Sequence, residues 1–302
     1  MSKWGKTIES IFKSKQSFEL FLLSFFTRLL PSKWYLQRRF KLQAGYPLNL
    51  NNPRTFNEKL QWLKLNDHNP EYSRMVDKYE AKQYVADRIG EEHIIPTLAV
   101  YDRVDDIDFD KLPDQFVLKC THDSGGLVIC KEKSKLDRKA AKKKLSKSFH
   151  HKYYWDGREW PYKAVKPRII AEQYIAEEDG ELKDYKVFNF GGEPKIIQID
   201  YNRFKGHQRN LYTADWKRID ATIEFPSDPQ KEFEKPEVLN DLLAYARKLS
   251  KDIPHLRTDF YIINNHIYFG EMTFYHGSGM ERISPVSFDV LMGEWIVLPK
   301  KD

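Results

Sequence analysis

Residues 257–271 read Arg-Thr-Asp-Phe-Tyr-Ile-Ile-Asn-Asn-His-Ile-Tyr-Phe-Gly-Glu, and this stretch decides the fold. Two runs rich in aromatic and β-branched residues flank Asn264-Asn265, a pair typical of a tight turn between antiparallel strands. Side chains two positions apart on a strand share a face, so we expect Arg257 and Asp259 to lie side by side. The stretch therefore predicts a β-hairpin with an arginine and two carboxylates, those of Asp259 and Glu271, at one end.

Two acidic side chains at one end of a hairpin repel each other unless water or a cation separates them. Counting from the turn places Asp259 opposite Phe269 or Gly270, close to Glu271. Proteins commonly hold Mg²⁺ through one or two carboxylates together with substrate phosphates. An arginine beside such an ion can stabilise a phosphoryl group in transfer. The alternative is an ordinary surface Arg–Asp pair, which contributes little.

An earlier stretch also has the pattern of two strands joined by a loop. Residues 116–120 and 127–131 predict two strands, joined by the loop Thr121-His122-Asp123-Ser124-Gly125-Gly126. Lys119 lies near the end of the first strand, where it can reach a phosphate that the N–H groups of the loop also bind. The two glycines allow the backbone to approach a ligand closely. A plain hairpin turn beside a surface lysine is the alternative.

The remaining patterns interleave helices with short strands, which indicates an α+β or α/β class. Thr55 and Glu58 have the spacing of a capping box before an apolar run. Glu172-Gln173-Tyr174-Ile175 ends an apolar strand and can offer backbone hydrogen bonds and an apolar wall to a purine. The other expected helices are 72–89, 138–148 and 239–251, and the other expected strands are 168–175, 185–190 and 194–199.

Composition excludes several classes of protein. The chain has 302 residues, of which 41% are hydrophobic and 31% charged, so it can bury a sizeable core and is neither collagen-like nor wholly disordered. The net charge of +6 is mildly basic. The dense basic cluster at 131–147 has the pattern of an exposed helix face and has no nucleic-acid-binding motif beside it. We therefore expect no nucleic acid partner.

The two cysteines, Cys120 and Cys130, are too few for a disulfide framework or a zinc site. They flank the Gly-containing loop of the first hairpin, which would allow them to face each other across it. Two buried, reduced thiols are the favoured interpretation, and they predict a cytoplasmic location.

Residues 18–30 form the most apolar stretch, but they are too few to span a bilayer and include Glu19 and Arg28. A signal peptide would need a small-residue cleavage site after this stretch, and none follows. We favour a helix packed on the protein and ended by Pro31. The alternative is an interfacial helix surrounded by lysines, which would give residues 1–50 a peripheral contact with the inner face of the membrane.

In their order, these motifs resemble the ATP-grasp superfamily, and within it the TupA-like branch, which is linked to teichuronopeptide and other cell-surface polysaccharide biosynthesis. The similarity runs from Thr55 to about Leu298. The stretches that carry it are Asp77-Lys78-Tyr79, residues 112–119, residues 122–126, residues 158–162 (Arg-Glu-Trp-Pro-Tyr), Asp184-Tyr185-Lys186 and residues 269–274 (Phe-Gly-Glu-Met-Thr-Phe).

The resemblance implies an α+β, ATP-grasp fold in which two subdomains grip ATP. Residues 1–54 would form a helical N-terminal region, and residues 55–302 the ATP-grasp domain. Within that domain we expect a small ATP-lid subdomain at about 112–172 and a metal-binding subdomain at about 173–298.

The resemblance also implies a role for each motif, with ATP and Mg²⁺ as the bound groups. The residues expected to bind ATP are Lys78, Lys119, His122, Ser124, Gly125, Gly126, Glu172, Gln173, Tyr174, Ile175, Asp184 and Lys186. The residues expected to act in catalysis are Arg257, Lys119 and Lys186. The expected Mg²⁺ ligands are Asp259, Glu271 and Thr273. Many ATP-grasp enzymes have asparagine at the last of these positions, whereas Glu-x-Thr-Phe is typical of the TupA-like branch.

The activity that the resemblance implies is ATP-dependent ligation of a carboxylate to an amine through an acyl-phosphate. The carboxylate would belong to a uronic acid of a cell-surface polysaccharide or its precursor, and the amine to an amino acid. The candidate acceptor-binding residues are Arg203, Arg209, His276 and Ser278. The alternatives are a kinase-like phosphoryl transferase acting on a sugar and a glycosyltransferase of polysaccharide biosynthesis.

Overall fold

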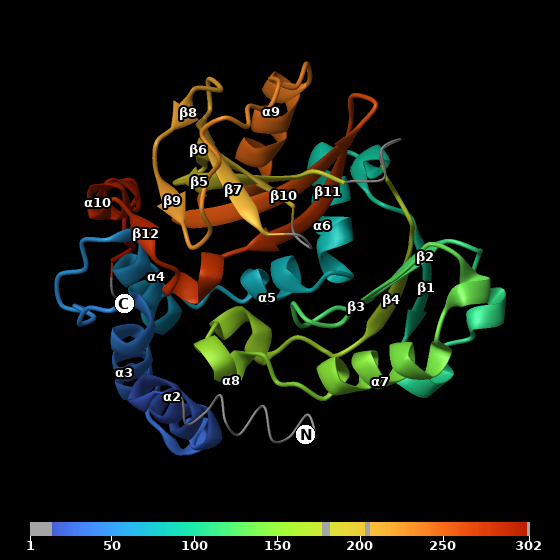
Figure 1. The fold of residues 1–302 in the computed structure, drawn as a ribbon, viewed down its shortest axis with the longest axis horizontal. Helices are drawn as coiled ribbons and strands as arrows, with labels where there is room; N and C mark the ends of the chain where they lie inside the picture. Colours follow the sequence, from blue (N-terminus) through green and yellow to red (C-terminus); the bar gives the residue numbers. More distant parts are fainter. Residues whose placement is uncertain (1–13, 177–181, 203–205, 301–302) are drawn as a thin grey trace.

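The computed structural model describes residues 14–176, 182–202 and 206–300. Two antiparallel sheets dominate it, and in Figure 1 they lie on different sides of the molecule with α5 (Glu71–Val76) and α6 (Glu80–Ile89) between them. Each sheet has its own cluster of buried apolar side chains. The two clusters correspond to two lobes, and the mixture of helices with antiparallel sheets confirms the predicted α+β class.

The smaller lobe has a four-stranded sheet in the order β1-β4-β2-β3. Phe116, Leu118 and Cys120 alternate into a core covered by α7, so the side chain between the last two, Lys119, lies on the opposite face. The elements of this lobe are β1 (Thr97–Tyr101), β2 (Phe116–Cys120), β3 (Leu127–Cys130), β4 (Ile169–Gln173) and α7 (Arg138–Phe149).

The larger lobe has a six-stranded sheet in the order β11-β10-β5-β6-β7-β8. Asn264 and Asn265 both have positive φ, 50° and 60°, which confirms the tight turn of the last hairpin. The strands are β5 (Asp184–Phe190), β6 (Glu193–Tyr201), β7 (Gln208–Thr213), β8 (Arg218–Ile219), β10 (His255–Ile263) and β11 (His266–Thr273). The helix packed on β5, β6 and β10 is α9 (Leu239–Ser250), and β9 (Thr222–Ile223) pairs with β12 (Ile283–Ser284).

The helix expected over residues 72–89 is two helices, so that prediction is wrong. Asp77 is extended, with ψ of 113°, and separates α5 (Glu71–Val76) from α6 (Glu80–Ile89). Its carboxylate accepts hydrogen bonds from the backbone N–H of Tyr79 and from Arg168. The capping box of Thr55 and Glu58 is confirmed at the start of α4 (Phe56–Asn66).

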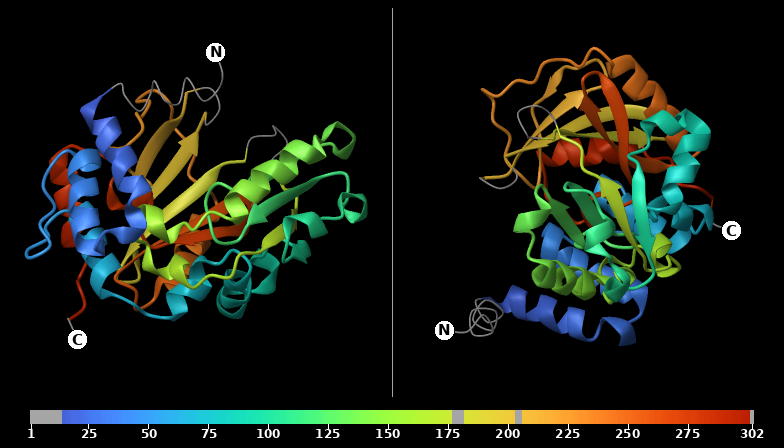
Figure 2. Two further views of the ribbon diagram at one scale, coloured as in Figure 1. Left: turned by 90° about the horizontal axis from the view of Figure 1, so that it is seen from below. Right: turned by 90° about the vertical axis from the view of Figure 1, so that its right-hand side faces the viewer.

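The N-terminal helices lie at one edge of the molecule (Figure 2). They are α2 (Lys15–Phe25) and α3 (Ser32–Ala44), and α3 contributes Tyr35, Leu36 and Phe40 to the larger core. The prediction that residues 18–30 pack on the protein is wrong for most of them, because Leu23 alone is buried in α2. No helix among the described residues is both long and apolar enough to cross a membrane.

Cys120 and Cys130 are both buried and free. The register places Cys130 opposite Phe116, at the far end of the hairpin from Cys120. The two thiols therefore do not face each other.

Candidate active site

Three candidate residues lie in one row across the larger sheet. On adjacent strands, Lys186 of β5 is the register partner of Asp259 of β10, which is in turn the partner of Glu271 of β11. The alignment depends on a bulge, because Phe260 pairs with Phe269 and leaves Gly270 as an extra residue. This bulge moves Asp259 one position from where counting placed it, directly opposite Glu271.

Asp259 is the centre of a buried ion network. Arg257 donates to both of its oxygens, from Nε to Oδ1 and from Nη2 to Oδ2, at 2.7 Å each. Lys186 Nζ donates to Oδ2 at 2.6 Å and to Asp184 Oδ2 at 2.5 Å. Asp259 is only 2% exposed, so these cations compensate a charge that burial would otherwise make costly.

Glu271 is the more accessible carboxylate, with a side chain 38% exposed. Its Oε1 accepts from Arg257 at 3.0 Å, and its Oε2 lies 3.9 Å from Lys78 Nζ. Burial opposes ionisation, but Lys78 and Arg257 outweigh it and lower the pKa of Glu271 to about 2. Thr273 Oγ1 lies 3.4 Å from the same Oε1.

These oxygens suit Mg²⁺, because it prefers carboxylate and hydroxyl oxygen donors completed by phosphate and water. The described residues contain no group of three His, Cys, Asp or Glu side chains that could hold a metal without such help. The role of Asp259, Glu271 and Thr273 as Mg²⁺ ligands stays a prediction that their chemistry supports.

A second charged cluster lies on the face of the small sheet opposite α7. Glu172 of β4 is buried between two lysines, with 2.6 Å from Oε2 to Lys119 Nζ and 2.7 Å from Oε1 to Lys82 Nζ. Burial raises the pKa of Glu172, but the two lysines outweigh that effect and lower it. Lys119 also lowers the pKa of Glu271, which shows that the charges of the two lobes act on each other.

Lys78 connects the lobes directly. It lies in the break between α5 and α6, and its Nζ donates to the carbonyl of Asp123 at 2.6 Å while facing Glu271. Its backbone N–H also donates to the carbonyl of Thr121. The lysine thus holds the loop 121–126 beside the carboxylates of the larger sheet.

The loop residues point in different directions. Ser124 and Gly125 are exposed, whereas His122 is buried with its ring 6.1 Å from that of Phe149. Gly126 packs so tightly that an added Cβ would lie 2.5 Å from the sulfur of Cys120. The exposed pair is therefore the part of the loop that a phosphate can approach.

The segment expected to bind the purine begins inside β4 and leaves it. The backbone N–H of Gln173 donates to the carbonyl of Pro96, and Tyr174 and Ile175 are partly exposed beyond the strand. Asp184, expected at the ribose, is buried beside Lys186.

A family model decides which proteins this chain is related to. The model described as TupA-like ATPgrasp matches residues 58–297. The chain belongs to the TupA-like ATP-grasp family. No curated protein matches it.

Solved structures resemble this TupA-like protein over part of their length. They include D-alanine–D-alanine ligase from Bacillus anthracis complexed with ATP (15% identity, 66% of this chain, 53% of that chain, TM-score 0.39). The Helicobacter pylori D-alanine–D-alanine ligase is similar, with 15% identity over 74% of this chain and 61% of that chain, and a TM-score of 0.41. Another is the ATP-grasp ligase PsnB, complexed with a precursor variant, Mg and ADP. It has 10% identity over 79% of this chain and 65% of that chain, and a TM-score of 0.40. The chain spans between 53% and 65% of the length of these proteins.

Two of the candidate acceptor residues have partners inside this TupA-like protein. His276 Nδ1 lies 2.6 Å from Arg257 Nη1, and its Nε2 lies 2.9 Å from Glu281 Oε2. Burial lowers the pKa of His276 to about 4, so the neutral ring accepts from the arginine at Nδ1 while its Nε2 faces the glutamate. Arg209 forms two ion pairs, from Nε to Asp200 Oδ1 at 2.7 Å and from Nη1 to Glu281 Oε2 at 3.0 Å.

Ser278 lies in a strained loop, whereas Arg203 lies outside the described residues. Gly277, Ser278 and Gly279 all have φ between 53° and 60°, a region that costs a serine energy. Lys64 Nζ holds this turn by donating to the carbonyl of Ser278 at 2.7 Å and to its Oγ at 2.9 Å. The roles of the four acceptor candidates stay predictions.

Sequence reasoning missed three charged residues of this site: Lys82, Glu281 and Lys64. Lys82 had a signal, because it lies four positions after Lys78 in the sequence. Glu281 and Lys64 had none, since Arg209 and Ser278, with which they also pair, come from distant parts of the chain.

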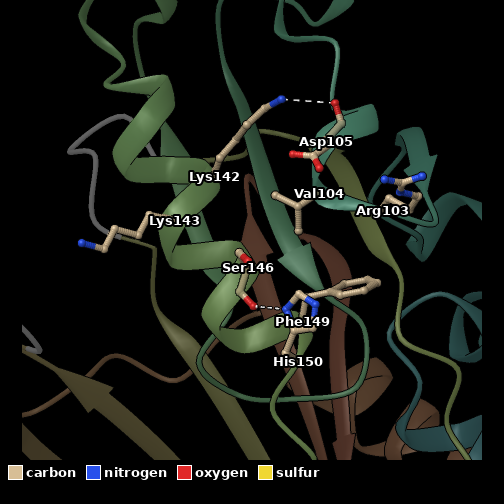
Figure 3. Close-up of a pocket in the computed structure, with 8 residues that line it drawn as sticks. All are labelled: Arg103, Val104, Asp105, Lys142, Lys143, Ser146, Phe149 and His150. Atoms are coloured by element: carbon tan, nitrogen blue, oxygen red, sulfur yellow. Dashed lines mark hydrogen bonds between the residues drawn. The ribbon is translucent and has the colours of Figure 1, made fainter.

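One cavity of the structure lies apart from the candidate nucleotide-binding residues. A cavity of about 360 Å³ lies between α7 and the segment 103–105 (Figure 3). Its lining includes Lys142 and Phe149 of α7, which covers the face of the small sheet opposite Lys119. It therefore lies on the other side of the small sheet from Lys119.

Proposed function

We propose that this chain is an ATP-dependent carboxylate–amine ligase, a carbon–nitrogen bond-forming enzyme that acts through an acyl-phosphate. One observation carries the proposal: Lys78, from the break between α5 and α6, lies between the loop of the small lobe and Glu271 of the large sheet. With Lys119, Lys186 and Arg257, it surrounds the carboxylates with cations suited to a triphosphate. Membership of the ATP-grasp family supports ATP as that triphosphate.

In the first step, a carboxylate oxygen of the acceptor forms a bond to the γ-phosphorus of ATP, and the bond to the β,γ-bridging oxygen breaks to release ADP. Lys186 and Arg257 stabilise the negative charge that gathers on the transferred group. Bound Mg²⁺ supplies further charge stabilisation at the phosphates. His276 keeps the guanidinium of Arg257 in place.

In the second step, the amine nitrogen attacks the acyl carbon, the bond from carbon to the phosphate oxygen breaks, and inorganic phosphate leaves. The amine proton passes to solvent. Phosphate leaves far more easily than the oxygen of a free carboxylate, which is why the ATP is needed. The exposed Ser124 and Gly125 lie where closure of the loop would keep water from the acyl-phosphate.

For the substrates, we infer a uronic acid of a cell-surface polysaccharide or its precursor, joined to an amino acid, because the sequence resembles the branch linked to such polymers. The use of ATP and two free, buried thiols favours the cytoplasm.

A kinase-like phosphoryl transferase acting on a sugar hydroxyl is the second candidate. It is favoured by the internal pairing of Arg209 with Asp200 and Glu281, which occupies a cation that was expected to bind the acceptor carboxylate. A kinase would leave a stable phosphoester, whereas the ligase releases phosphate and forms an amide.

The test is a phosphate-release screen that crosses uronic acids, or their nucleotide sugars, with amino acids. We expect phosphate only when acid, amine and Mg·ATP are all present, and none with Lys119→Ala. Lys217→Ala, at a surface lysine 79% exposed, is the matched control and should be fully active. Absence of a thermal shift with Mg·ATP on the unmutated protein would refute both candidates.

A further inference from the structure

Helix α2 presents its apolar side to solvent. Phe18, Phe21, Leu22 and Phe25 recur at the spacing of one helix face, and Phe25 is 71% exposed. Leu29, just beyond the helix, is 80% exposed. Buried Leu23 lies on the opposite side. The apolar face of this helix therefore points away from the protein, whereas a packed surface helix turns its apolar face inward.

The surroundings of this apolar face are strongly basic. The first 47 residues contain nine Lys or Arg and two Glu, whereas the remaining 255 residues have a net charge of −1. Lys15, Arg28 and Lys33 are exposed around the apolar face. Trp34, half exposed at the start of α3, adds a side chain that favours membrane interfaces.

The two N-terminal helices are fixed to the body of the protein. Arg158 is 2% exposed, and its guanidinium donates to the carbonyls of Thr27 and Leu30. Tyr35 OH donates to the carbonyl of Asp156 at 2.7 Å. Figure 2 shows α2 and α3 projecting together at one edge, outside both sheets. The exposed face is therefore presented on a firm base.

We propose that α2 and the residues up to Trp34 dock on an anionic lipid surface, with the apolar face in the headgroup boundary and the cations on the lipid phosphates. A single apolar face could also bind a protein, but the concentration of positive charge around it favours an anionic bilayer. The proposal does not depend on the ligase activity. It would bring the enzyme to lipid-linked substrates if that activity holds.

The test is co-sedimentation of the full chain with vesicles of phosphatidylcholine, with or without phosphatidylglycerol. We expect binding to the anionic vesicles alone, weakened by salt. The double variant Phe25→Ser/Leu29→Ser should bind at least about tenfold more weakly. A triple variant, with Lys15, Arg28 and Lys33 replaced by Gln, should lose at least about tenfold and most of the salt dependence.

The matched control is Val286→Ser/Val297→Ser, which removes two apolar side chains that are 71% and 78% exposed elsewhere on the surface. It should bind like the unmutated protein. Equal vesicle binding by the Phe25/Leu29 variant would overturn the proposal, as would no binding of the unmutated protein. A dimer in light scattering that the Phe25/Leu29 variant abolishes, without vesicle binding, would assign the face to a second copy of the chain instead.

Discussion

Replacing Glu281 with glutamine tests whether the network behind Arg257 has the strength that its geometry indicates. Glu281 Oε2 lies 2.9 Å from His276 Nε2 and 3.0 Å from Arg209 Nη1. Burial favours the neutral acid, but these two partners outweigh it and lower the pKa of Glu281 from 4.5 to about 2. In full, that displacement corresponds to about 3 kcal/mol, but the His276 ring is neutral at pH 7 and adds no charge there, so less than this is present at neutral pH.

Because the Glu281 side chain is 22% exposed, water screens part of this energy, and we expect Glu281→Gln to lower the free energy of unfolding by about 2 kcal/mol at pH 7. A carboxyl with a depressed pKa in the folded state stabilises the protein fully above its unfolded pKa. That stability is lost as the pH falls through the folded pKa. The difference between protein and variant should therefore be constant above about pH 5 and shrink between pH 4.5 and 2.

Urea titrations of both proteins across this pH range measure the difference. The control is Glu193→Gln, which removes a surface carboxylate 58% exposed and should change stability by less than about 0.5 kcal/mol. A loss of less than about 0.5 kcal/mol for Glu281→Gln, or one that does not vary with pH, would refute the reasoning.

Three further predictions concern the bulge, the small lobe and a buried histidine. Gly270→Ala would place a Cβ 3.1 Å from the carbonyl of Asp259, so we expect about 1–2 kcal/mol less stability and a smaller thermal shift with Mg·ATP. Glu172→Gln leaves its two lysine partners without a counter-charge and should cost about 3–5 kcal/mol in urea titrations. Burial lowers the pKa of His255 to about 3, so stability should fall as the pH drops from 6.5 toward 3. His255→Gln should flatten that slope.

The two hairpins were predictable because their signals are local. Alternating apolar residues and the Asn264-Asn265 turn define the last hairpin within seventeen residues, from 257 to 273. The break at Asp77 was not predictable, because the helical pattern continues through it. What ends α5 there is an ion pair with Arg168, whose distance along the chain conceals it.

The face that α2 turns toward the protein could not be predicted from the sequence either. Its sequence shows one apolar face, but periodicity does not say whether that face meets the protein or something else. The outcome depends on Arg158, which fixes the following turn from a segment more than a hundred residues away. Which face of a helix packs depends on the tertiary structure, so the amphipathic pattern in the sequence was compatible with both a packed and an interfacial helix.

The candidate site was predictable in its residue types and less so in its pairings. Motif lysines and carboxylates compensate each other in the structure: Lys119 with Glu172, and Lys186 with Asp259. If phosphates bound alone, they would pair with these lysines and leave the carboxylates without a counter-charge. If Mg²⁺ bound alone, it would pair with the carboxylates and leave the lysines without one. Bound together, the ion and the triphosphate compensate both sets at once, because each supplies the partner that the other removes. The network is therefore suited to a metal–nucleotide complex rather than to either component, and that preference arises from the pairing across strands rather than from any one motif.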